Sequence, residues 1–509
     1  MSILLSWTPR TLGELLAAAP RESEALVTAT ARLTYGELLQ HAKEVAGGMH
    51  ALGLRKGDHV ALLMGNDEHW LTLFYGAALL GAVTVPVNTR FKAAELEFCL
   101  GQADCKALIY APKFLNQDFA AMVREVKPRL AKLAHAVPVG ELRAAPFVPG
   151  EVKPQDLLLI QFTSGTTAYP KGVMLTHDNM LRNAAAAGER IGVRPEDRYF
   201  NCRPFFHVGG STLSALVCLV YGACLATLPT FEAGEALAMM ERERCTLTSG
   251  NDTVFQMLMG HEDFPKRKLA LRGGWAAAGP ETMKRIIHVL GARHICAAYG
   301  LSEASPNVVM SDWRDPEELR VQGLATPLPD LHLRTVDGEI QVRGWSMMRG
   351  YYNNADATAK AFTEDGWLRT GDLGELQPGG RLKMVGRLKD VFRVGGENVA
   401  PAEVEEVLLG HPAVQTAQVI GVPDARLGEV PCAYVTLKSG QLVTPAALIA
   451  WTKERCANFR VPRYIRIVAN FEAIGMTASG KVQKSKLREH ALKEFKLQDG
   501  PSAQPAIRE

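Results

Sequence analysis

The sequence predicts an α/β protein, in which a large N-terminal region of layered α/β sub-domains precedes a smaller α+β region. Three observations support this class. The chain has 509 residues, several times the ~150 of an ordinary domain, so more than one domain is expected. Helix-like segments alternate with short apolar runs through its first three quarters, which is typical of layered helices and sheets. After Gly374 the sequence predicts shorter strands separated by glycine turns.

The alternation is clearest near the N-terminus. There, predicted helices lead into mostly apolar runs of the kind that form strands buried on both faces. The helical segments and the runs that go with them are 35–52 with 59–64, 68–80 with 82–87, and 95–101 with 107–110. A Pro-containing stretch, 137–154, predicts a loop or a seam between sub-domains.

Composition excludes several classes of protein. The 57 Lys and Arg nearly balance the 54 Asp and Glu, which argues against a dedicated nucleic-acid binder. Apolar residues make up 47% of the chain, so a mainly disordered protein is excluded. The nine cysteines show no CxxC pairing and no histidine at zinc spacing, which indicates buried thiols in a reducing compartment.

Two stretches without charged residues, 71–89 and 211–230, are long enough to resemble membrane spans. Each contains a Gly-Ala pair followed by a β-rich run, so a buried helix that ends at glycine and leads into a buried strand fits better. The first residues lack a basic segment and a small-residue cleavage site. We therefore expect no membrane span, no signal peptide and a cytoplasmic location.

The segment 157–183 carries the strongest chemical signal. An apolar strand, 157–160, runs into a loop rich in hydroxyl groups, and a helix is expected from about Thr176. Hydroxyls, free backbone N–H groups and a lysine can surround a polyphosphate, and glycine allows close backbone approach. A polar surface turn is the alternative, and Pro170 excludes a Walker A loop. The residues assigned to this phosphate loop are Thr163, Ser164, Gly165, Thr166, Thr167 and Lys171.

Two later motifs offer groups that suit a nucleotide. Tyr299 presents a ring on which a base can stack, and Glu303 is a hard oxygen ligand for Mg²⁺. Asp372, beside Gly371, can accept ribose hydroxyls, although an aspartate in a turn is the simpler interpretation of this position alone. Residues 300–304 nearly match the G-x-S-x-G elbow of hydrolases, but Ala304 breaks the last position.

Together these motifs resemble the adenylate-forming enzymes, a family that includes acyl-CoA synthetases, luciferases and the adenylation domains of peptide synthetases. The stretch TSGTTAYPKG at 163–172 is similar to the family's phosphate loop. Further matches follow in the family's order along nearly the whole chain. They are FFH at 205–207, YGLSE at 299–303, TGD at 370–372, GRLKD at 386–390, GGEN at 395–398 and GK at 480–481.

The resemblance implies a role for each motif. Lys481 would bridge the attacking carboxylate and the α-phosphate of ATP, which stabilises the charge that forms there. Glu303 would bind Mg²⁺. The implied catalytic residues are Lys481, Glu303, Thr166 and His207. Outside the phosphate loop, the resemblance also implies a set of residues that bind the nucleotide or coenzyme A: Ala278, Gly279, Tyr299, Gly300, Ser302, Asp372, Arg387, Lys389, Gly395 and Gly396.

The resemblance also implies two domains that move. Lys389 would be the hinge between residues 1–388 and a small, mobile domain, 389–509, whose last residues, 498–509, are expected to be frayed. Rotation of the small domain would remove Lys481 and bring in the Gly395-Gly396 loop, which would line the tunnel for coenzyme A. His207 would gate the path between the acid and that tunnel; a packed core histidine is the alternative.

The region around Lys481 allows other interpretations. Residues 475–482 satisfy G-x4-G-K, but Val482 fails the Ser/Thr requirement of a Walker A loop. Lys481 also lies in a basic run, 453–496, with eleven Lys or Arg and four Asp or Glu. This excess indicates either a solvated face or an edge that faces phosphate.

The sequence thus predicts an ATP-dependent acid:CoA ligase that releases AMP and pyrophosphate and uses a small carboxylic acid, coenzyme A and Mg²⁺. The expected walls of the acid pocket, 206–210, 275–278 and 298–308, contain no Lys or Arg. An apolar acid is therefore expected, a medium-chain fatty acid first and an aryl or alicyclic acid second. A stand-alone adenylation enzyme that loads a carrier protein and a P-loop phosphotransferase are alternatives. A homodimer is compatible with the sequence.

Overall fold

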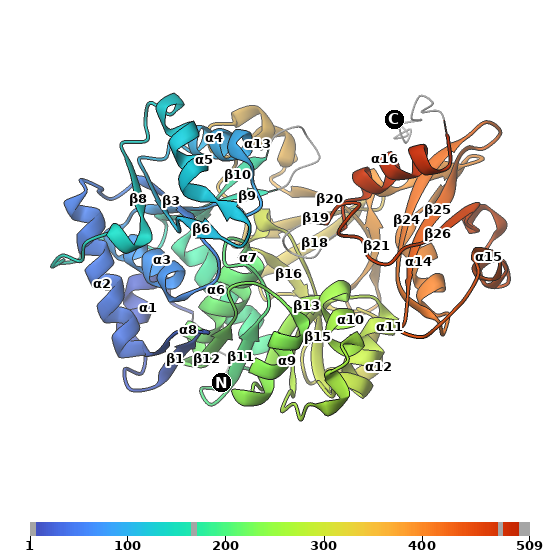
Figure 1. The fold of residues 1–509 in the computed structure, drawn as a ribbon, viewed down its shortest axis with the longest axis horizontal. Helices are drawn as coiled ribbons and strands as arrows, with labels where there is room; N and C mark the ends of the chain where they lie inside the picture. The colour runs from blue at the N-terminus through green and yellow to red at the C-terminus, as the bar shows by residue number, and fades with distance from the viewer. Residues whose placement is uncertain (1–6, 164–169, 477–481, 498–509) are drawn as a thin grey trace.

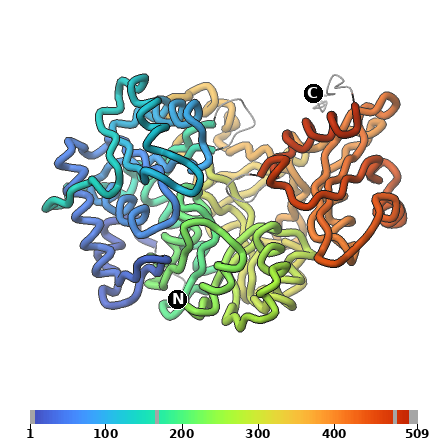
Figure 2. The backbone as a smooth tube through the Cα atoms, in the orientation of Figure 1, coloured from blue at the N-terminus to red at the C-terminus, as the bar shows by residue number. Residues whose placement is uncertain are grey.

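The structure, a computed structural model, describes residues 7–163, 170–476 and 482–497. A large N-terminal part, blue to yellow in Figure 1, lies beside a smaller C-terminal part in orange and red. The backbone trace of Figure 2 shows the same division. The predicted class, layered α/β followed by a small α+β region, is confirmed. Within the described ranges no helix is long and apolar enough to cross a bilayer.

The first sheet of the large part is mostly parallel and consists of six strands. In order across the sheet they are β10 (Lys171–Thr176), β9 (Leu157–Thr163), β4 (Val83–Pro86), β3 (His59–Leu63), β5 (Ala107–Tyr110) and β8 (His135–Pro138). Only β9 and β10 are antiparallel. Val60 and Leu62 enter one core and Ala61 and Leu63 another, so β3 is buried on both faces as predicted.

The second sheet has nine strands, and those in its centre are parallel. In order they are β17 (Thr326–Pro327), β16 (Asn307–Met310), β15 (His294–Gly300), β14 (Gly273–Ala277), β13 (Leu247–Asn251), β11 (Arg198–Asn201), β12 (Cys224–Thr227), β1 (Glu24–Val27) and β2 (Arg32–Thr34). Its inner face shares one hydrophobic core with the first sheet, so both sheets are fixed relative to each other. The carboxyl ends of β9, β11, β14 and β15 lead into predicted motifs.

Helices cover both sheets and fill the space between them (Figure 1). Those of the large part are α1 (Leu12–Ala18), α2 (Tyr35–Ala51), α3 (Glu68–Leu80), α4 (Ala93–Gln102), α5 (Phe119–Val126), α6 (His177–Ile191), α7 (Val208–Gly210), α8 (Val217–Tyr221), α9 (Ala233–Arg242), α10 (Asp252–Gly260), α11 (Pro280–Arg285), α12 (Glu317–Val321) and α13 (Ala355–Ala361). A small hairpin is formed by β6 (Lys113–Phe114) and β7 (Gln117–Asp118). Short 3-10 turns occupy Lys127–Arg129, Val139–Glu141, Phe264–Lys266, Ser302–Ala304, Leu388–Asp390 and Asn458–Arg460, and π-helical turns occupy Ser211–Leu216 and Ile286–Leu290.

The two charge-free stretches form buried helices, as predicted. Helix α3 ends at Gly81 with φ 76° and leads into β4, and α8 ends at Gly222 with φ 69° and leads into β12. A left-handed residue at a helix end favours glycine, because glycine has no Cβ to clash. Thr176 caps α6 as predicted. The expected loop at 137–154 is shorter, because β8 includes Val137 and Pro138.

Two antiparallel units follow. The first is a four-stranded sheet of β18 (Leu331–Val336), β19 (Glu339–Gly344), β20 (Leu368–Gln377) and β21 (Arg381–Arg387). The second is a five-stranded sheet of β23 (Glu397–Val399), β22 (Phe392–Val394), β25 (Gly428–Leu437), β24 (Val414–Asp424) and β26 (Tyr464–Ile467). Its helices are α14 (Pro401–Leu409), α15 (Pro445–Lys453) and α16 (Lys484–Glu494). The expectation of short strands is met by β22 and β23, which have three residues each around the Gly395-Gly396 turn, but not by β24 and β25, which have 11 and 10 residues. Gly421 lies within this ribbon, where a Cβ would meet Phe392 at 2.5 Å, so packing rather than a turn requires glycine.

Candidate active site

The strand expected to lead into the phosphate loop is β9, and the hairpin partner that returns from it is β10. Thr163, at the end of β9, lies opposite Lys171, at the start of β10. Both residues therefore lie where the predicted loop begins and ends, at the carboxyl end of the first sheet. The remaining loop residues assigned from the sequence, Ser164, Gly165, Thr166 and Thr167, lie outside the described residues.

A polar chain connects Lys171 to the predicted metal ligand. The Lys171 ammonium lies 4.9 Å from the centre of the Tyr351 ring, a favourable cation–π distance. The Tyr351 hydroxyl donates a hydrogen bond of 2.9 Å to Oε1 of Glu303. Burial and the neighbouring Glu303 carboxylate raise the pKa of Tyr351, so it remains a neutral donor. Tyr351 thus contacts the ammonium through its ring and the carboxylate through its hydroxyl.

Tyr351 was not identified from the sequence. It reaches this position because residues 350–352 lie alongside β10: the Met174 N–H donates to the Gly350 carbonyl, and the Tyr352 N–H to the Gly172 carbonyl. The pair of tyrosines after Gly350 was the available signal, but nothing local predicts pairing with a strand almost 180 residues earlier.

The Glu303 turn is held by buried contacts. Glu303 lies in the 3-10 turn between β15 and β16, and its backbone carbonyl accepts from the Met348 N–H at 2.8 Å. Asn183 of α6, fully buried, donates to the Ala304 and Asn307 carbonyls. Gly300 is required at the entry to this turn, because a Cβ there would lie 2.0 Å from the Pro306 carbonyl oxygen. Ser302 begins the turn and is partly buried.

The predicted base and ribose residues form a second polar cluster. The Tyr299 hydroxyl donates to Oδ2 of Asp372 at 2.9 Å, and Nε of Arg387 lies 3.3 Å from its Oδ1. Asp372 and Arg387 face each other across β20 and β21. Burial, and then the Asp372 charge, raise the pKa of Tyr299. The cluster therefore joins the end of β15 to β20 and β21, so Asp372 does not lie in an isolated turn.

The predicted adenine segment lies beside this cluster in the second sheet. Ala278 and Gly279 follow β14, the strand next to β15, and are partly buried. The Gly279 N–H donates to Oδ1 of Asp252 at 3.3 Å. Burial, with a smaller contribution from the Glu405 carboxylate of α14, raises the pKa of Asp252 to about 6. This carboxyl group, not identified from the sequence, thus lies where the two parts of the molecule meet.

His207 ends the segment that connects β11 to α7. Its Nδ1 accepts a hydrogen bond from the Gly209 N–H at 3.0 Å, so the proton of the neutral ring is on Nε2. Gln161 of β9 donates to the Phe206 carbonyl at 3.0 Å, which joins this segment to the phosphate-loop strand. His207 is partly exposed rather than packed in the core. A π-helical turn follows at Ser211–Leu216, a feature that is frequent at functional sites.

The predicted hinge forms a 3-10 turn, Leu388–Asp390, directly after β21. Partial burial, and the charge of Arg387, lower the pKa of Lys389, while the Asp390 and Asp372 carboxylates oppose the shift. Lys389 therefore lies close to the Asp372 cluster. The Gly395-Gly396 pair forms an exposed turn between β22 and β23, with φ 58° and 99°, and the Gly395 N–H donates to the Leu427 carbonyl. Within the described ranges, no hydrogen bond joins this pair to another predicted site residue.

Lys481 lies outside the described residues, but both ends of its loop are described. Met476 and Val482 form an antiparallel bridge that closes the loop. The Met476 carbonyl accepts a hydrogen bond of 2.9 Å from Nη1 of Arg90, just after β4 in the first sheet. The base of the loop therefore lies at the edge where β4 and β9 end. Val482 is buried in the core of the C-terminal part, so it offers nothing to a metal ion.

The basic run at 453–496 is largely neutralised within the C-terminal part. Seven of its Lys and Arg side chains make ion pairs with acidic residues of that part. The pairs are Arg455–Glu454, Arg460–Glu403, Arg463–Asp424, Arg466–Glu494, Lys484–Glu405, Lys486–Glu489 and Arg488–Glu429. Of the two interpretations of this run, the solvated and paired face fits these residues better than an edge that faces phosphate.

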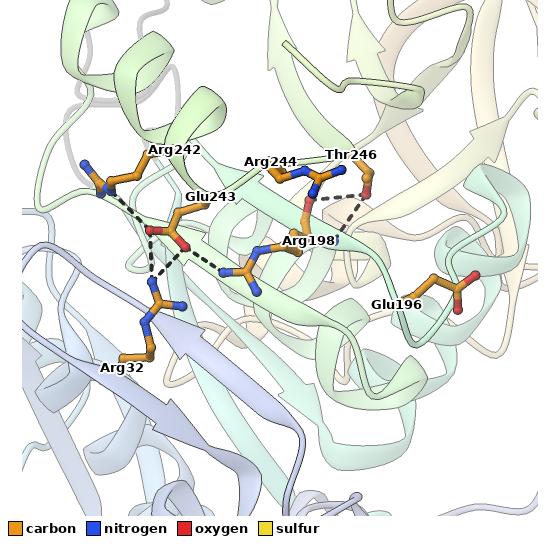
Figure 3. Close-up of a pocket in the computed structure, with 7 residues that line it drawn as sticks. All are labelled: Arg32, Glu196, Arg198, Arg242, Glu243, Arg244 and Thr246. Carbon is orange, nitrogen blue, oxygen red and sulfur yellow. Dashed lines mark hydrogen bonds and ion pairs between the residues drawn. The ribbon is translucent and has the colours of Figure 1, made fainter. Parts of the chain in front are cut away.

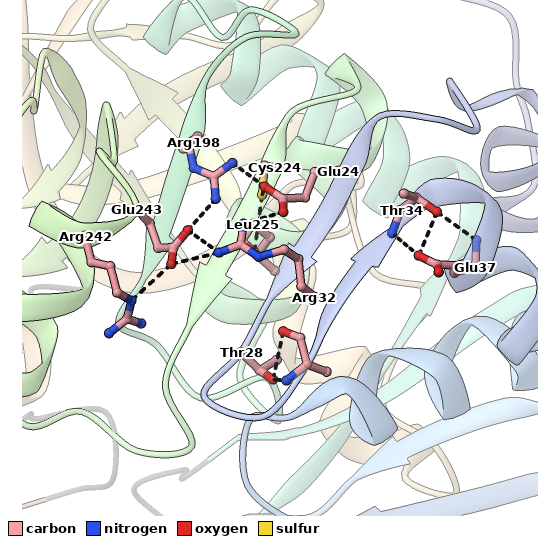
Figure 4. A network of polar contacts seen from close by, with 11 residues as sticks. Glu24, Thr28, Arg32, Thr34, Glu37, Arg198, Cys224, Leu225, Arg242 and Glu243 are labelled. Atoms are coloured by element: carbon pink, nitrogen blue, oxygen red, sulfur yellow. Dashed lines mark hydrogen bonds and ion pairs between the residues drawn. The ribbon is translucent and has the colours of Figure 1, made fainter.

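A pocket of about 650 Å³ lies away from these motifs, at the amino ends of β11 and β13 (Figure 3). Four arginines contribute to its lining, but two carboxylates hold three of them. Glu243 pairs with Arg32, Arg198 and Arg242, and Glu24 pairs with the first two (Figure 4). Its charge is therefore mostly compensated, and it lies at the opposite end of the strands from the predicted nucleotide site.

The sequence matches the family of AMP-binding enzymes over residues 14–352 and the AMP-binding enzyme C-terminal domain over residues 403–481. The first match covers more than half of the chain. The protein therefore belongs to the AMP-binding enzyme family, and within it to the adenylate-forming acyl-CoA ligases.

Three similar proteins illustrate this class. The mitochondrial medium-chain acyl-CoA ligase ACSF2 of Macaca fascicularis is 32% identical, over 96% of this chain and 88% of its own. A CoA ligase of Mycobacterium tuberculosis is 37% identical, over 95% of this chain and 99% of its own. It is named for an acid in which a propanoyl group is attached to a methylated, dioxo-substituted octahydroindene ring. The crystal structure of the anthranilate CoA ligase AuaEII with anthranoyl-AMP has a TM-score of 0.88 at 25% identity, covering 97% and 100% of the two chains.

Proposed function

We propose that this ligase activates a carboxylic acid as its acyl-adenylate, with release of pyrophosphate, and then transfers the acyl group to coenzyme A, with release of AMP. The observation that carries the proposal is the meeting of two polar clusters at the carboxyl ends of the sheets. Lys171, Tyr351 and Glu303 suit the phosphates of ATP. Asp372 and Arg387 suit its ribose, and Tyr299 suits its base.

In the first step, a carboxylate would attack the α-phosphate. Positioning and electrostatic stabilisation account for most catalysis of this kind, because little covalent chemistry is required of the protein. We assign Lys171, Ser302 and the loop 163–167 to the phosphates and Ala278, Gly279 and Gly300 to the base. Lys481 would bind both the attacking carboxylate and the α-phosphate, and Thr166 would act beside it.

The proposed metal ion is Mg²⁺, and the residues present fit it. Magnesium usually takes one or two protein carboxylates and completes its shell with water and substrate phosphates. Glu303 supplies such a carboxylate, with only one of its oxygens bonded to Tyr351 among the described contacts. No group of three or more potential metal-ligand side chains occurs among the described residues, which fits an ion that phosphates help to hold. Bound Mg²⁺ would neutralise phosphate charge.

For the second step, we propose a domain boundary after residue 388 and rotation of residues 389–509 about Lys389. In the present arrangement Arg90 holds the base of the Lys481 loop, and Gly395-Gly396 is exposed elsewhere. This arrangement suits adenylate formation. Rotation would withdraw Lys481 and bring Gly395-Gly396 to the site as the wall of a coenzyme A tunnel, with His207 as the gate.

For the acid we propose a medium-chain carboxylic acid, with an aryl or alicyclic acid as the second candidate. ACSF2 is named for medium-chain acids, whereas the Mycobacterium tuberculosis relative is named for a ring-bearing acid. The nine cysteines are all unpaired, and eight are buried, which fits a reducing compartment such as the cytoplasm.

The test is a panel of acids incubated with ATP, Mg²⁺ and coenzyme A, with AMP and acyl-CoA measured together. We expect equal amounts of both products and no AMP without the acid. Turnover that needs an added acyl-carrier protein and ignores coenzyme A would instead support the carrier-loading alternative.

The Lys481→Ala variant tests the two-step assignment. Because Lys481 is assigned only to the first step, pyrophosphate release should fall at least about 100-fold, as for loss of a transition-state contact. Thioester formation from supplied acyl-adenylate and coenzyme A should remain within about threefold of the wild type. Each half-reaction is measured separately, and equal loss of both would contradict the assignment.

A further inference from the structure

A buried arginine beside the predicted acid pocket has no ionic partner. Arg203 follows β11 and is only 7% exposed. Its guanidinium lies over the Trp275 ring, 5.4 Å from the centroid. Among the described residues, no carboxylate pairs with it and its Nε atom has no hydrogen-bond acceptor. A buried charge without a counter-charge is unfavourable, so the site is incomplete as it stands.

The backbone around Arg203 is held firmly, so the side chain is presented by a rigid support. Its carbonyl accepts hydrogen bonds of 2.8 Å from the side chains of both Asn66 and Asn201. Asn66 also accepts from the Phe205 N–H at 2.7 Å. Four residues later comes His207, and a Cβ on Gly209 would lie 3.8 Å from Arg203 Cγ. The side chain therefore passes between the first turn of α7 and the Trp275 ring.

Other buried donors share this region. Trp275 Nε1 and Thr212 Oγ1 are buried and, within the described part of the chain, have no hydrogen-bond partner, whereas the buried Ser249 hydroxyl lies within reach of the Tyr199 hydroxyl. Ser249 and Trp275 lie opposite each other on β13 and β14, so their side chains point to the same face of the sheet. Thr212 belongs to the π-helical turn that follows α7. Each of these groups can donate a hydrogen bond, and so can the guanidinium.

These residues adjoin the walls that the sequence assigned to the acid, 206–210 and 275–278. Those walls contain no Lys or Arg, which favoured an apolar acid. Arg203 lies just outside the first of them in the sequence, but its side chain contacts Trp275 in the second. The wall is therefore not wholly apolar. Among the described residues, the buried groups beside it that lack a partner include the donors Arg203 Nε and Trp275 Nε1, and also an acceptor, Gln161 Oε1, whose amide nitrogen binds the Phe206 carbonyl.

We propose that the acid carries a second oxygen acceptor, a ketone or a second carboxylate, at a distance from the reacting carboxylate, and that Arg203 binds it together with Trp275. This inference rests on the proposed function and names the substrate class of that same site. A guanidinium can bind a carboxylate through two hydrogen bonds or a carbonyl through one. The ring-bearing relative, whose named substrate has two oxo groups, is consistent with this class.

The experiment compares acids of equal length: octanoate, its keto analogue with the ketone next to the terminal methyl group, and octanedioate. The wild type should use at least one oxygen-bearing acid with a kcat/KM for pyrophosphate release at least about tenfold above that for octanoate. The Arg203→Met variant should lose that preference, with a fall of about 100-fold for the favoured acid, expressed mainly in its KM. The KM for ATP should stay within about threefold.

Two further variants separate binding from structure. Trp275→Phe keeps an aromatic ring beneath the guanidinium but removes the N–H donor. It should therefore reduce the preference for the oxygen-bearing acid several-fold without abolishing it. Arg194→Met, an exposed arginine in the loop before β11, is the matched control and should keep the wild-type preference. Thermal unfolding of Arg203→Met should occur at or above the wild-type Tm, because a buried charge without a partner is removed.

The outcomes are distinguishable. A preference for the ketone identifies a carbonyl as the partner, a preference for octanedioate identifies a carboxylate, and both support the proposal. If octanoate is used as efficiently as the better of the two analogues, or if Arg203→Met loses activity equally with all three acids, the proposal is overturned. Absence of pyrophosphate release with every acid in the wild-type protein would refute the proposed function instead.

Discussion

At the scale of single residues, burial determines which groups are charged. His177, the first residue of α6, is fully buried, and its Nδ1 accepts a hydrogen bond from the Leu12 N–H at 3.1 Å. Burial lowers the pKa of His177 to about 4, although the Asp156 and Glu14 carboxylates oppose this shift. The neutral imidazole is therefore part of the link between the N-terminal helix and α6.

This shift predicts a loss of stability in acid. Between about pH 6.5 and 4 the unfolded chain binds a proton at His177 that the folded protein does not, so stability falls as pH falls through this range, by on the order of 3 kcal/mol. His177→Asn retains an acceptor without titrating. Its Tm should fall less than the wild-type Tm between pH 7 and 5, whereas His41→Asn, an exposed control, should follow the wild type. Parallel curves for all three would contradict the prediction.

At the scale of elements, tight turns position the chemical groups. Glu303 is placed by a turn between two antiparallel strands, and the turn is possible because Gly300 allows the Pro306 carbonyl to approach. Asn183 of α6 binds the other side of the same turn. The position of one carboxylate therefore depends on a glycine in a strand and on an asparagine in a distant helix.

Replacing Gly300 by alanine should move this turn. A Cβ 2.0 Å from backbone oxygen cannot be accommodated without displacement, so we expect a loss of about 2–4 kcal/mol in stability. Activity should fall at least about 100-fold, because Glu303 loses its productive position. The control is Gly150→Ala, an exposed site where a Cβ meets nothing within 4 Å. Both are measured by chemical denaturation and AMP release, and wild-type values for Gly300→Ala would refute the argument.

At the scale of the whole molecule, few polar contacts join the two parts through the residues that the structure describes. Arg90 binds the Met476 carbonyl at 2.9 Å, and Gln415 of β24 donates to the Gln256 carbonyl of α10 at 3.0 Å. A small cavity of about 110 Å³ lies in the same region as the second contact. An interface with few strong contacts is suited to relative motion of the two parts.

Arg90→Ala should shift the balance between the two proposed arrangements. Loss of one interdomain hydrogen bond, worth about 1 kcal/mol, should slow pyrophosphate release roughly fivefold. Thioester formation from supplied acyl-adenylate should be unchanged or faster, because it uses the other arrangement. Arg143→Ala, at an exposed site in the loop after β8, should leave both half-reactions unchanged. A slower second half-reaction in Arg90→Ala would contradict this model of domain movement.

The sequence by itself predicted the class of fold and the order of the motifs. The alternation of helices and apolar runs, the glycines that end α3 and α8, and the Thr176 cap are local patterns, and each formed as predicted. Local patterns also misled: short strands are expected after Gly374, but β24 and β25 are long, and Gly421 lies inside β24, where Phe392 packs against it. Local sequence specifies a residue's preferences but not its distant neighbours.

Only the tertiary structure decided which side chains meet. Tyr351 contacts Glu303 because residues 350–352 lie alongside β10, and Asp372 meets Tyr299 because strands of two different sheets converge. Arg203 lies outside the predicted wall of the acid pocket in the sequence, and only the fold brings its guanidinium over the Trp275 ring. Composition and periodicity thus determined the architecture, whereas register and packing between distant segments determined the electrostatics of the site, because these depend on contacts that no local pattern records.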